Sequence, residues 1–420
     1  MPVPALEAGV FAHTQTEAPF GGTGGGTADL SAPQPIRGSG AFLPQTESSE
    51  ALLLTDDATI PRALDAAAAF LPQTESGEAL QFSGMDFLVT GGGRGTGRRA
   101  AFDVVSRGGR VALGTRNPAN VESFTDEMRQ AQENGEISGE INVEESVRPF
   151  IVNLKSQLEI VEGVYDLHEG GFEGLDGWIH AAAEGMQTFT TKEKLLGGIV
   201  TLRGIKKRQG LDSEAYQEAK QNLQRNLAQW VWQAMPGAMN SNYEGPRTLL
   251  NELRYRKMLK PGAKIGNLGS VWTDMIGQPG VEVPSWYLPV CTKQSFDLEL
   301  QAKENRARLE AEGIYPFTLI GQVIDNTDVG NMFRGGIFQL MSDEDAARYI
   351  ESSKPMTTAD MSTTLQMMLL SDPNNPEQWT SGKPRKLYVL GPTDTKEAVA
   401  QNVLWELPPD HPMLTFRSPI

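Results

Sequence analysis

A glycine-rich turn constrains this chain more strongly than any other feature of its sequence. Residues 90–97 read Thr-Gly-Gly-Gly-Arg-Gly-Thr-Gly; they follow the apolar run Phe87–Val89 and precede a stretch predicted to be helical through about Ser106. Glycines let the backbone turn tightly and approach a pyrophosphate group, which then lies at the N-terminus of the helix. Because a strand precedes the glycines and a helix follows them, the motif predicts a phosphate-binding turn.

From Gly84 onward, short apolar runs alternate with helix-like stretches, which is typical of repeated βαβ units and a parallel sheet. Seven strands are predicted, at residues 87–89, 110–114, 150–153, 175–181, 264–268, 316–321 and 386–390. Helices are predicted from Asn117-Pro118 and from about Lys293 to Gly313, with helical insertions over 189–239 and 325–372. We therefore predict an α/β fold, with a doubly wound parallel sheet over 84–395 and a C-terminal tail over 396–420.

Residues 1–83 differ from the rest in being rich in Gly, Pro, Ser, Thr and Ala. The segment AFLPQTESSEAL at 41–52 recurs almost unchanged as AFLPQTESGEAL at 69–80. Two copies are too few for a solenoid. We interpret this region as a low-complexity N-terminal arm, or duplicated linker, that packs on the surface of the domain. A partner-docking peptide present in two copies is the alternative.

Charge and composition exclude several classes of function. A net charge of −16 argues against nucleic acid and anionic membranes as partners, because both are negatively charged. The single cysteine and the four scattered histidines show no metal-ligand spacing, so no metal is predicted. We find no apolar run of membrane-spanning length and no secretory signal at Met1–Val10. A soluble cytoplasmic protein is therefore expected.

The glycine spacing, with Gly91, Gly95 and Gly97 after Thr90, resembles the TGxxxGxG pattern of the common short-chain dehydrogenases/reductases. The extended, epimerase-like members use TGxxGxxG, which would require a glycine where Arg94 stands. The resemblance covers about residues 84–330 and implies a Rossmann-type fold that binds a nicotinamide dinucleotide. It assigns cofactor contacts to Thr90, Gly91, Gly93, Arg94, Gly95, Thr96 and Gly97.

Two arginines indicate NADP rather than NAD. Arg94 lies in the turn, and Arg116 follows the second predicted strand, where NAD-binding members of the family carry an acid. The stretch 114–117 reads Gly-Thr-Arg-Asn without an acid, and a guanidinium group suits a 2′-phosphate. By resemblance, further cofactor contacts are Asn153 near the adenine, Ala181 and Ala182 after the fourth strand, and Thr327 at the nicotinamide carboxamide.

The family's reductase chemistry uses a tyrosine, a lysine, a serine and an asparagine. Asn242 in Asn-Tyr-Glu-Gly, Ser270 after the fifth strand and Lys293 at the start of a helix match this set. The usual YxxxK spacing would place the tyrosine at Pro289, so Tyr287 is the nearest candidate. Tyrosine has a pKa near 10, so a cation beside it is needed for proton transfer near neutral pH. A packing role for Tyr287 remains the alternative.

His180 ends the fourth predicted strand, where the family has an NNAG stretch; we interpret it as a packed strand-end histidine, with a catalytic role as the alternative. The methionine-rich segment around 342–372 would either cover a substrate or form ordinary helical core.

The resemblance implies NADPH-dependent reduction of a carbonyl, and residues 320–332 resemble ketoreductase domains of fungal-type fatty-acid synthases. The preferred substrate is therefore a 3-oxoacyl thioester, as a small molecule or bound to a carrier. Enoyl reductases of the same superfamily use Tyr-x6-Lys, so an enoyl-thioester reductase is one alternative. A non-catalytic NADP-binding scaffold subunit is another. A homo-oligomer or a place in a larger complex is expected.

Overall fold

The computed structural model describes residues 80–184, 189–276, 283–322, 324–325, 327, 330, 333–352, 354, 356–372, 385–407, 411, 414 and 419. The predicted N-terminal arm lies outside these residues except for its last positions. There, Phe82 is fully buried and its ring packs edge-on against Phe87 at 5.2 Å. Residues just before the predicted boundary at 84 therefore pack into the domain.

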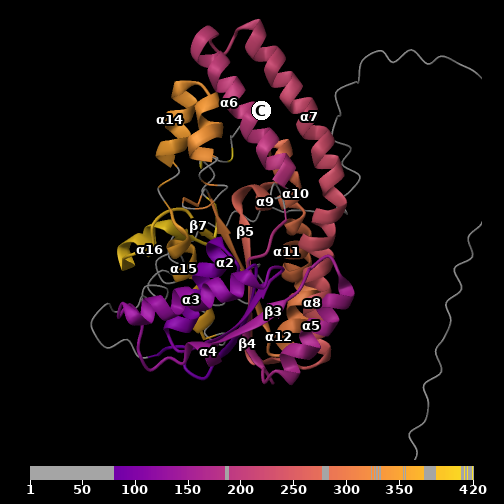
Figure 1. Ribbon diagram of the computed structural model, residues 1–420, viewed down its shortest axis with the longest axis vertical. Coiled ribbons are helices and arrows are strands. Elements are labelled where there is room, and N and C mark those ends of the chain that lie inside the picture. Colours follow the sequence, from indigo (N-terminus) through magenta and orange to yellow (C-terminus); the bar gives the residue numbers. More distant parts are fainter. Residues whose placement is uncertain are drawn as a thin grey trace, which may run out of the picture. The chain divides into compact units, whose positions relative to one another are not determined.

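An eight-stranded sheet forms the centre of the described region, in the order β3-β2-β1-β4-β5-β6-β7-β8 (Figure 1). The strands are β1 (Asp86–Thr90), β2 (Arg110–Thr115), β3 (Val147–Ile151), β4 (Leu175–His180), β5 (Leu259–Ser270), β6 (Tyr315–Gly321), β7 (Lys386–Val389) and β8 (Val403–Leu404). All pairs are parallel except β7 with β8. The strand order reverses beside β1, which is the switch point where doubly wound sheets bind ligands.

The predicted Rossmann-type α/β fold of about seven strands is confirmed, and the sheet has one short strand in addition to the seven. The eighth strand has only two residues and pairs antiparallel, through Tyr388 with Leu404 and Val389 with Val403. Such a short strand leaves no alternating pattern to detect in the sequence. The helix α16 (Lys396–Asn402) leads into it. Residues 396–404, expected to be a tail, therefore belong to the sheet domain.

Helices cover both faces of the sheet because the strands are apolar on both sides. In β1, Phe87 and Val89 face one hydrophobic cluster and Leu88 faces the other, as successive side chains alternate in a strand. One face carries α2 (Gly95–Ser106), α3 (Ala119–Glu133), α4 (Val143–Ser146) and α15 (Thr358–Leu370). The other carries α5 (Gln157–Glu169), α8 (Gly245–Tyr255), α11 (Lys293–Gln301) and α12 (Lys303–Ala311).

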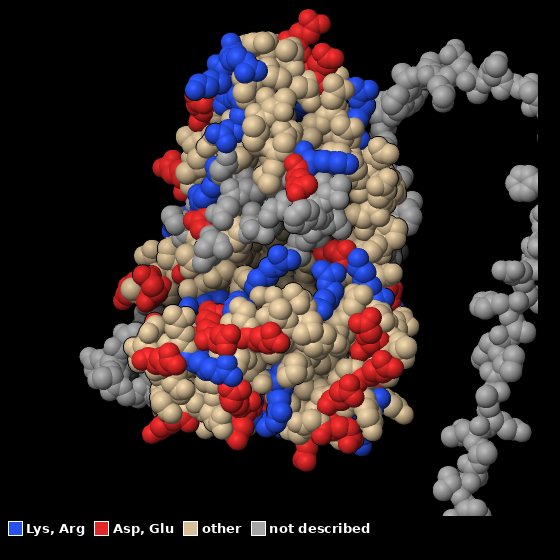
Figure 2. All heavy atoms as spheres, in the orientation of Figure 1, with Lys and Arg blue, Asp and Glu red and all other residues tan. Residues whose placement is uncertain are grey.

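The predicted insertion over 189–239 is a pair of long helices, α6 (Phe189–Gln209) and α7 (Glu214–Met239), which lie side by side (Figure 1). The last turn of α6 contains Lys206, Lys207 and Arg208, and Figure 2 shows basic side chains gathered toward that end. Cations there stabilise the C-terminal end of the helix dipole. A π-helical turn, η1 (Asn240–Glu244), connects α7 to α8.

A third hydrophobic cluster joins the α6–α7 pair to the segment that follows β5. That segment contains α9 (Val271–Met275), η2 (Ser285–Tyr287) and α10 (Leu288–Cys291). Leu195 and Ile199 of α6 belong to the same cluster as Trp286 and Tyr287. The inserted helices therefore support the tyrosine that sequence analysis selected.

The region 325–372 also contains the predicted helices: η3 (Phe333–Ile337), η4 (Phe338–Leu340), α14 (Asp343–Ser352) and α15. The methionines that the structure describes in this region are buried in the hydrophobic clusters, namely Met341, Met356, Met361, Met367 and Met368. They form ordinary hydrophobic core, which was one of the two interpretations of this methionine-rich segment.

The helix predicted over 293–313 is divided at Ala302, whose backbone is extended (φ −56°, ψ 136°), into α11 and α12. Gly313 has the left-handed φ of +77° that favours glycine just beyond a helix, as predicted. Among the residues that the structure describes, no helix has both the length and the apolar character needed to cross a membrane.

Candidate active site

The glycine turn joins β1 to α2 and is held between the ends of β2 and β4. The N–H groups of Gly91 and Gly92 both donate to the Gly114 carbonyl oxygen, each at 3.0 Å. A Cβ on Gly91 would lie 2.5 Å from the backbone nitrogen of Ala182, and one on Gly97 would lie 2.4 Å from the carbonyl oxygen of Gly91. Any side chain at these two positions would therefore force the turn apart.

The N-terminus of α2 presents the open side of this turn. Gly95 begins the helix with φ +59°, and no atom lies within 4 Å of where its Cβ would be. Thr96 follows it in the first turn, which contains no acidic residue, and Gly93 precedes it. The unpaired N–H groups of a first helical turn and the helix dipole both favour an anion. This cradle fits the pyrophosphate of a dinucleotide.

The two arginines predicted to recognise a 2′-phosphate are both exposed at this edge of the sheet. Arg94 directly precedes α2, and Arg116 follows β2. Asn153 follows β3 and is half-buried, and its side-chain oxygen accepts a hydrogen bond from the Lys155 backbone at 3.2 Å. The described structure therefore places all three beside the carboxyl ends of β1, β2 and β3.

The Thr90 side chain points into the sheet. Its hydroxyl is 2.8 Å from Nδ1 of His180 and accepts a hydrogen bond from Nε1 of Trp178 at 3.1 Å. The Thr90 carbonyl oxygen accepts from Ala181 N–H at 2.9 Å. A cofactor contact by the Thr90 hydroxyl, predicted from the resemblance, would have to compete with this buried network.

His180 is fully buried at the end of β4. Its ring contacts those of Trp178 and Phe296, with centroids 5.4 and 5.5 Å away. Burial, and then the charge of Lys293, hold the pKa of His180 well below its usual value, so the ring is neutral. The interpretation of His180 as a packed strand-end histidine is confirmed.

Tyr287 and Ser270 are joined by a hydrogen bond, although they are 17 positions apart in the sequence. The Tyr287 hydroxyl donates to Ser270 Oγ at 2.9 Å. Ser270 is the N-cap of α9, accepting from Thr273 N–H at 3.2 Å, and this fixes its position after β5. Tyr287 is the last residue of the one-turn helix η2 and directly precedes α10, in which Pro289 is the second residue. The chain thus reaches Ser270 without the usual tyrosine–lysine spacing.

The ring of Tyr287 packs edge-on against Trp272 and Trp286, with centroids 5.1 and 5.6 Å away. Burial raises the pKa of Tyr287 far above its usual value, and the hydrogen bonds that its side chain shares with Ser270 and Thr273 lower that pKa by less. The hydroxyl is therefore protonated at neutral pH.

Lys293 is buried at the start of α11 and points toward the end of β4. Its ammonium group donates to the His180 carbonyl oxygen at 3.0 Å. Burial lowers the pKa of Lys293 to about 7, and the charge of Asp297 raises it in part. The ammonium group is thus bonded to β4 in this arrangement, and not to Tyr287.

Asn242 lies in the π-helical turn η1 and is fully buried. Its amide accepts from Glu184 N–H at 2.6 Å and donates to the carbonyl oxygens of Glu184 and Pro289, at 2.7 and 2.9 Å. It also donates to Thr292 Oγ1 at 3.0 Å. The amide joins the segment after β4 to α10 and Thr292, which lie between Tyr287 and Lys293 in the sequence, and no hydrogen bond joins it to either of those two side chains within the described residues.

Thr327 follows β6, where its hydroxyl donates to the Ile324 carbonyl oxygen at 2.7 Å and accepts from Gly330 N–H at 3.0 Å. It stabilises a local turn. Several neighbouring positions lie outside the described residues, so the predicted contact with a nicotinamide remains a prediction.

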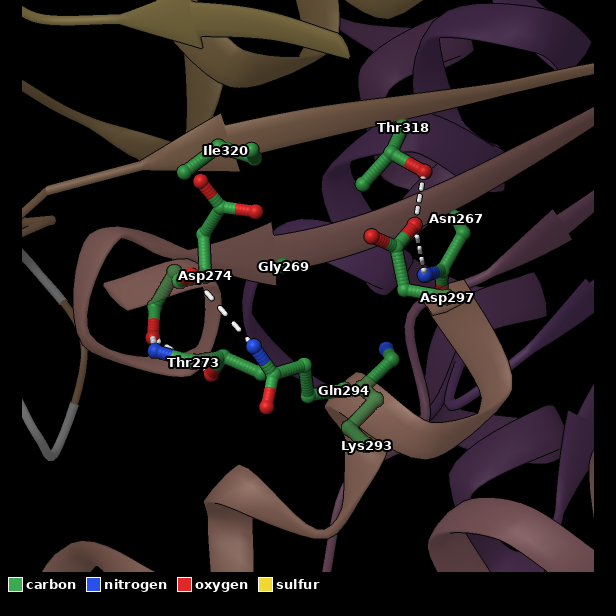
Figure 3. A pocket seen from close by; sticks show the side chains of 10 residues that line it. Asn267, Gly269, Thr273, Asp274, Lys293, Gln294, Asp297, Thr318 and Ile320 are labelled. Atoms are coloured by element: carbon green, nitrogen blue, oxygen red, sulfur yellow. Dashed lines mark hydrogen bonds between the residues drawn. The ribbon is translucent and has the colours of Figure 1, made fainter. Parts of the chain in front are cut away.

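A small polar pocket lies beside Ser270 and Lys293 (Figure 3). Three charged residues there were not predicted from the sequence: Asp274 and Asp297, which line the pocket, and Lys386, which binds both of them. Only the spacing of Lys293 and Asp297, one helical turn apart on α11, could have indicated any of this. The remaining lining residues are Asn267, Gly269, Thr273, Gln294, Thr318 and Ile320.

No protein-family model and no curated protein sequence matches the chain. Similar solved structures include a dehydrogenase/reductase from Sinorhizobium meliloti 1021, with 16% identity, coverage of 76% of this chain and 98% of that chain, and a TM-score of 0.45. A short-chain type dehydrogenase/reductase from Mycobacterium ulcerans has 15% identity, coverage of 76% and 91%, and a TM-score of 0.46. A metagenomic short-chain oxidoreductase in complex with NADP has 13% identity, coverage of 74% and 99%, and a TM-score of 0.42. With scores this low, the fold rests on the strand order given above.

Proposed function

We propose that this chain is an NADPH-dependent oxidoreductase of the short-chain dehydrogenase/reductase type that reduces the carbonyl of a 3-oxoacyl thioester. The proposal depends on the contacts that two parts of the site make at the end of β4. Gly91 of the phosphate-binding turn packs against Ala182, while Lys293 donates to the carbonyl oxygen of His180. The cofactor cradle and Lys293 thus both contact the end of β4, beside the switch point of the sheet, and this supports the proposal.

The side chains fit the acid–base part of such a reaction. NADPH, when bound, would supply the hydride. The Tyr287 hydroxyl would donate a proton to the substrate oxygen in place of its present hydrogen bond to Ser270 Oγ, and Ser270 would bond to the same oxygen. A charged Lys293 would lower the barrier by favouring the tyrosinate left behind. Backbone N–H groups of 93–97, at the α2 N-terminus, would hold the pyrophosphate, since those of Gly91 and Gly92 donate to Gly114.

The choice of a 3-oxoacyl thioester rests on the resemblance of residues 320–332 to ketoreductase domains. The test is NADPH oxidation by the purified full chain with short 3-oxoacyl and enoyl thioesters, each in parallel with NADH. We expect turnover with 3-oxoacyl thioesters and NADPH. Turnover of enoyl thioesters alone would establish the enoyl-reductase alternative, and no turnover in either series would contradict the proposed reaction.

A non-catalytic, NADP-binding scaffold is favoured by one observation. Lys293 is bonded to the backbone of His180, and the Asn242 amide is fully used by backbone and Thr292 partners. The two residues that would assist Tyr287 are thus both occupied elsewhere. NADPH binding by titration, without turnover of any thioester, would distinguish a scaffold from an enzyme.

A further inference from the structure

Four ionisable side chains lie at the polar pocket beside Lys293: Lys293 and Asp297 are buried, and Asp274 and Lys386 are half-buried. Asp297 binds Lys386 at 2.9 Å, and Lys386 also binds Asp274 at 2.5 Å. Two carboxylates and one ammonium group leave this group one negative charge in excess. Lys293 lines the same pocket and supplies the missing positive charge (Figure 3). An uncompensated charge in a buried site is strongly destabilising, so the group favours a charged Lys293.

We propose that Asp297 is a positioning residue that keeps the Lys293 ammonium group charged through the pocket that the two share. The proposal rests on the proposed function, in which a charged Lys293 assists Tyr287. The Asn242 amide is bonded to Glu184, Pro289 and Thr292 and makes no hydrogen bond to Lys293 within the described residues. The proposal therefore assigns support of the Lys293 ammonium group to Asp297.

The geometry places Asp297 well for this role. Lys293 and Asp297 lie one turn apart on α11, and only 2% and 6% of their surfaces are exposed. The carboxylate is held in place from three strands: Thr318 on β6 donates to it, Asn267 on β5 donates at 3.4 Å, and Lys386 on β7 binds it. No direct ion pair joins Lys293 to Asp297 within the described residues, so their coupling acts across the pocket.

Several other groups surround Lys293 and Asp297, and each limits the effect. Burial disfavours the charged form of Lys293, and His180 is neutral, so its ring provides no negative charge to offset this. Lys386 forms an ion pair with Asp297 and therefore competes with Lys293 for that carboxylate. Asp274 is neutralised by Lys386 and accepts from Tyr388 at 2.5 Å. The groups around this site are His180 on β4, Asp274 on α9, Tyr287 on η2, Cys291 on α10, Asp297 on α11, and Lys386 and Tyr388 on β7. Of these, Asp297 is the anion that raises the pKa of Lys293.

The experiment measures the pH dependence of unfolding, which needs no catalytic activity. Urea unfolding is followed from pH 5 to 10 for the full chain with and without Lys293→Met, in the wild-type and Asp297→Asn backgrounds. Because the folded pKa of Lys293, about 7, lies below its unfolded value, the Lys293 contribution to stability rises with pH above about 7. We call the pH at which this rise in stability begins the onset. In the Asp297→Asn background we expect the onset to lie about one pH unit lower than in the wild type.

Two further variants make the result specific. Glu299→Gln removes a carboxylate from the same helix, but one that pairs with Arg247 at 3.2 Å and accepts from Tyr243, so the onset should stay at its wild-type pH. Lys386→Met removes the competing cation and should move the onset to higher pH. If Asp297→Asn does not fold, Lys386→Met still tests the proposal, because an onset that this variant leaves unchanged would contradict the role of Asp297.

The same variants are then assayed for NADPH oxidation, where the alkaline fall of kcat should move with the stability onset. An onset that Asp297→Asn leaves unchanged, or that Glu299→Gln moves as far, would overturn the role of Asp297. A shifted onset in a chain that reduces no thioester would support the coupling and contradict the reductase instead.

Discussion

The glycine turn contacts Ala182 just after β4, and Lys293 of the Ser270–Tyr287–Lys293 group bonds to His180 at the end of β4. The turn and the group differ in the atoms that form them. The turn is backbone: its fit depends on the absence of Cβ atoms at Gly91 and Gly97, and its charged neighbours are exposed. The second group consists of side chains, and Tyr287 and Lys293 are almost fully buried. The turn should therefore be sensitive to volume, and the buried group to the loss of single polar atoms.

The largest expected effect comes from removing one oxygen atom in the buried group. Tyr287→Phe keeps the ring between Trp272 and Trp286 but removes the proton donor and its bond to Ser270. General-acid catalysis contributes about 10²–10⁴-fold, so turnover should fall by at least that much. NADPH affinity, measured by titration, should stay at the wild-type value.

Tyr216→Phe is the matched control for this variant. Tyr216 belongs to the same hydrophobic cluster, but its hydroxyl donates to the Leu340 carbonyl oxygen at 3.2 Å. Its loss should leave turnover near wild type. If Tyr287→Phe retains more than about a tenth of the activity, the general acid lies elsewhere.

A smaller effect is expected from adding one methyl group to the backbone-built turn. In Gly97→Ala the new Cβ would lie 2.4 Å from the Gly91 carbonyl oxygen and 2.9 Å from the Ala181 Cβ. Overpacking costs about 1–3 kcal/mol, more than the ~1 kcal/mol that alanine gains over glycine in a helix. Urea unfolding should show lower stability, and NADPH affinity should fall because the turn is displaced.

Gly139→Ala provides the comparison, because no atom lies within 4 Å of a Cβ at Gly139 and its φ is not left-handed. It should change neither stability nor NADPH affinity. Equal behaviour of the two alanine variants would show that the turn can widen without loss.

The same contrast explains what could be predicted from the sequence. The turn is local: β1, the glycines and α2 are consecutive, so residues 86–106 contain the whole signal. Tyr287 could be located because Pro289 excluded the usual position. Thr90 was predicted to contact the cofactor, which stays a prediction, whereas the contact of its hydroxyl with His180, 90 residues away, depends on the pairing of β1 with β4 and has no signal in the sequence. Lys386 and Asp274 are 112 residues apart, and no spacing rule connects them.

The smallest expected effect concerns the exposed arginine beside the turn. Arg116 is two residues beyond Gly114, whose carbonyl oxygen holds the turn, and no acid occurs in 114–117. We expect NADPH to bind at least about tenfold more tightly than NADH, or ~1.4 kcal/mol, and Arg116→Ala to remove most of this preference. The effect is modest because an exposed guanidinium group is screened by water and salt, so the preference should also shrink as ionic strength rises. Arg225→Ala, an equally exposed cation on α7, should leave the ratio of the two dissociation constants unchanged. Equal affinities of the wild type for both cofactors would remove the 2′-phosphate assignment altogether.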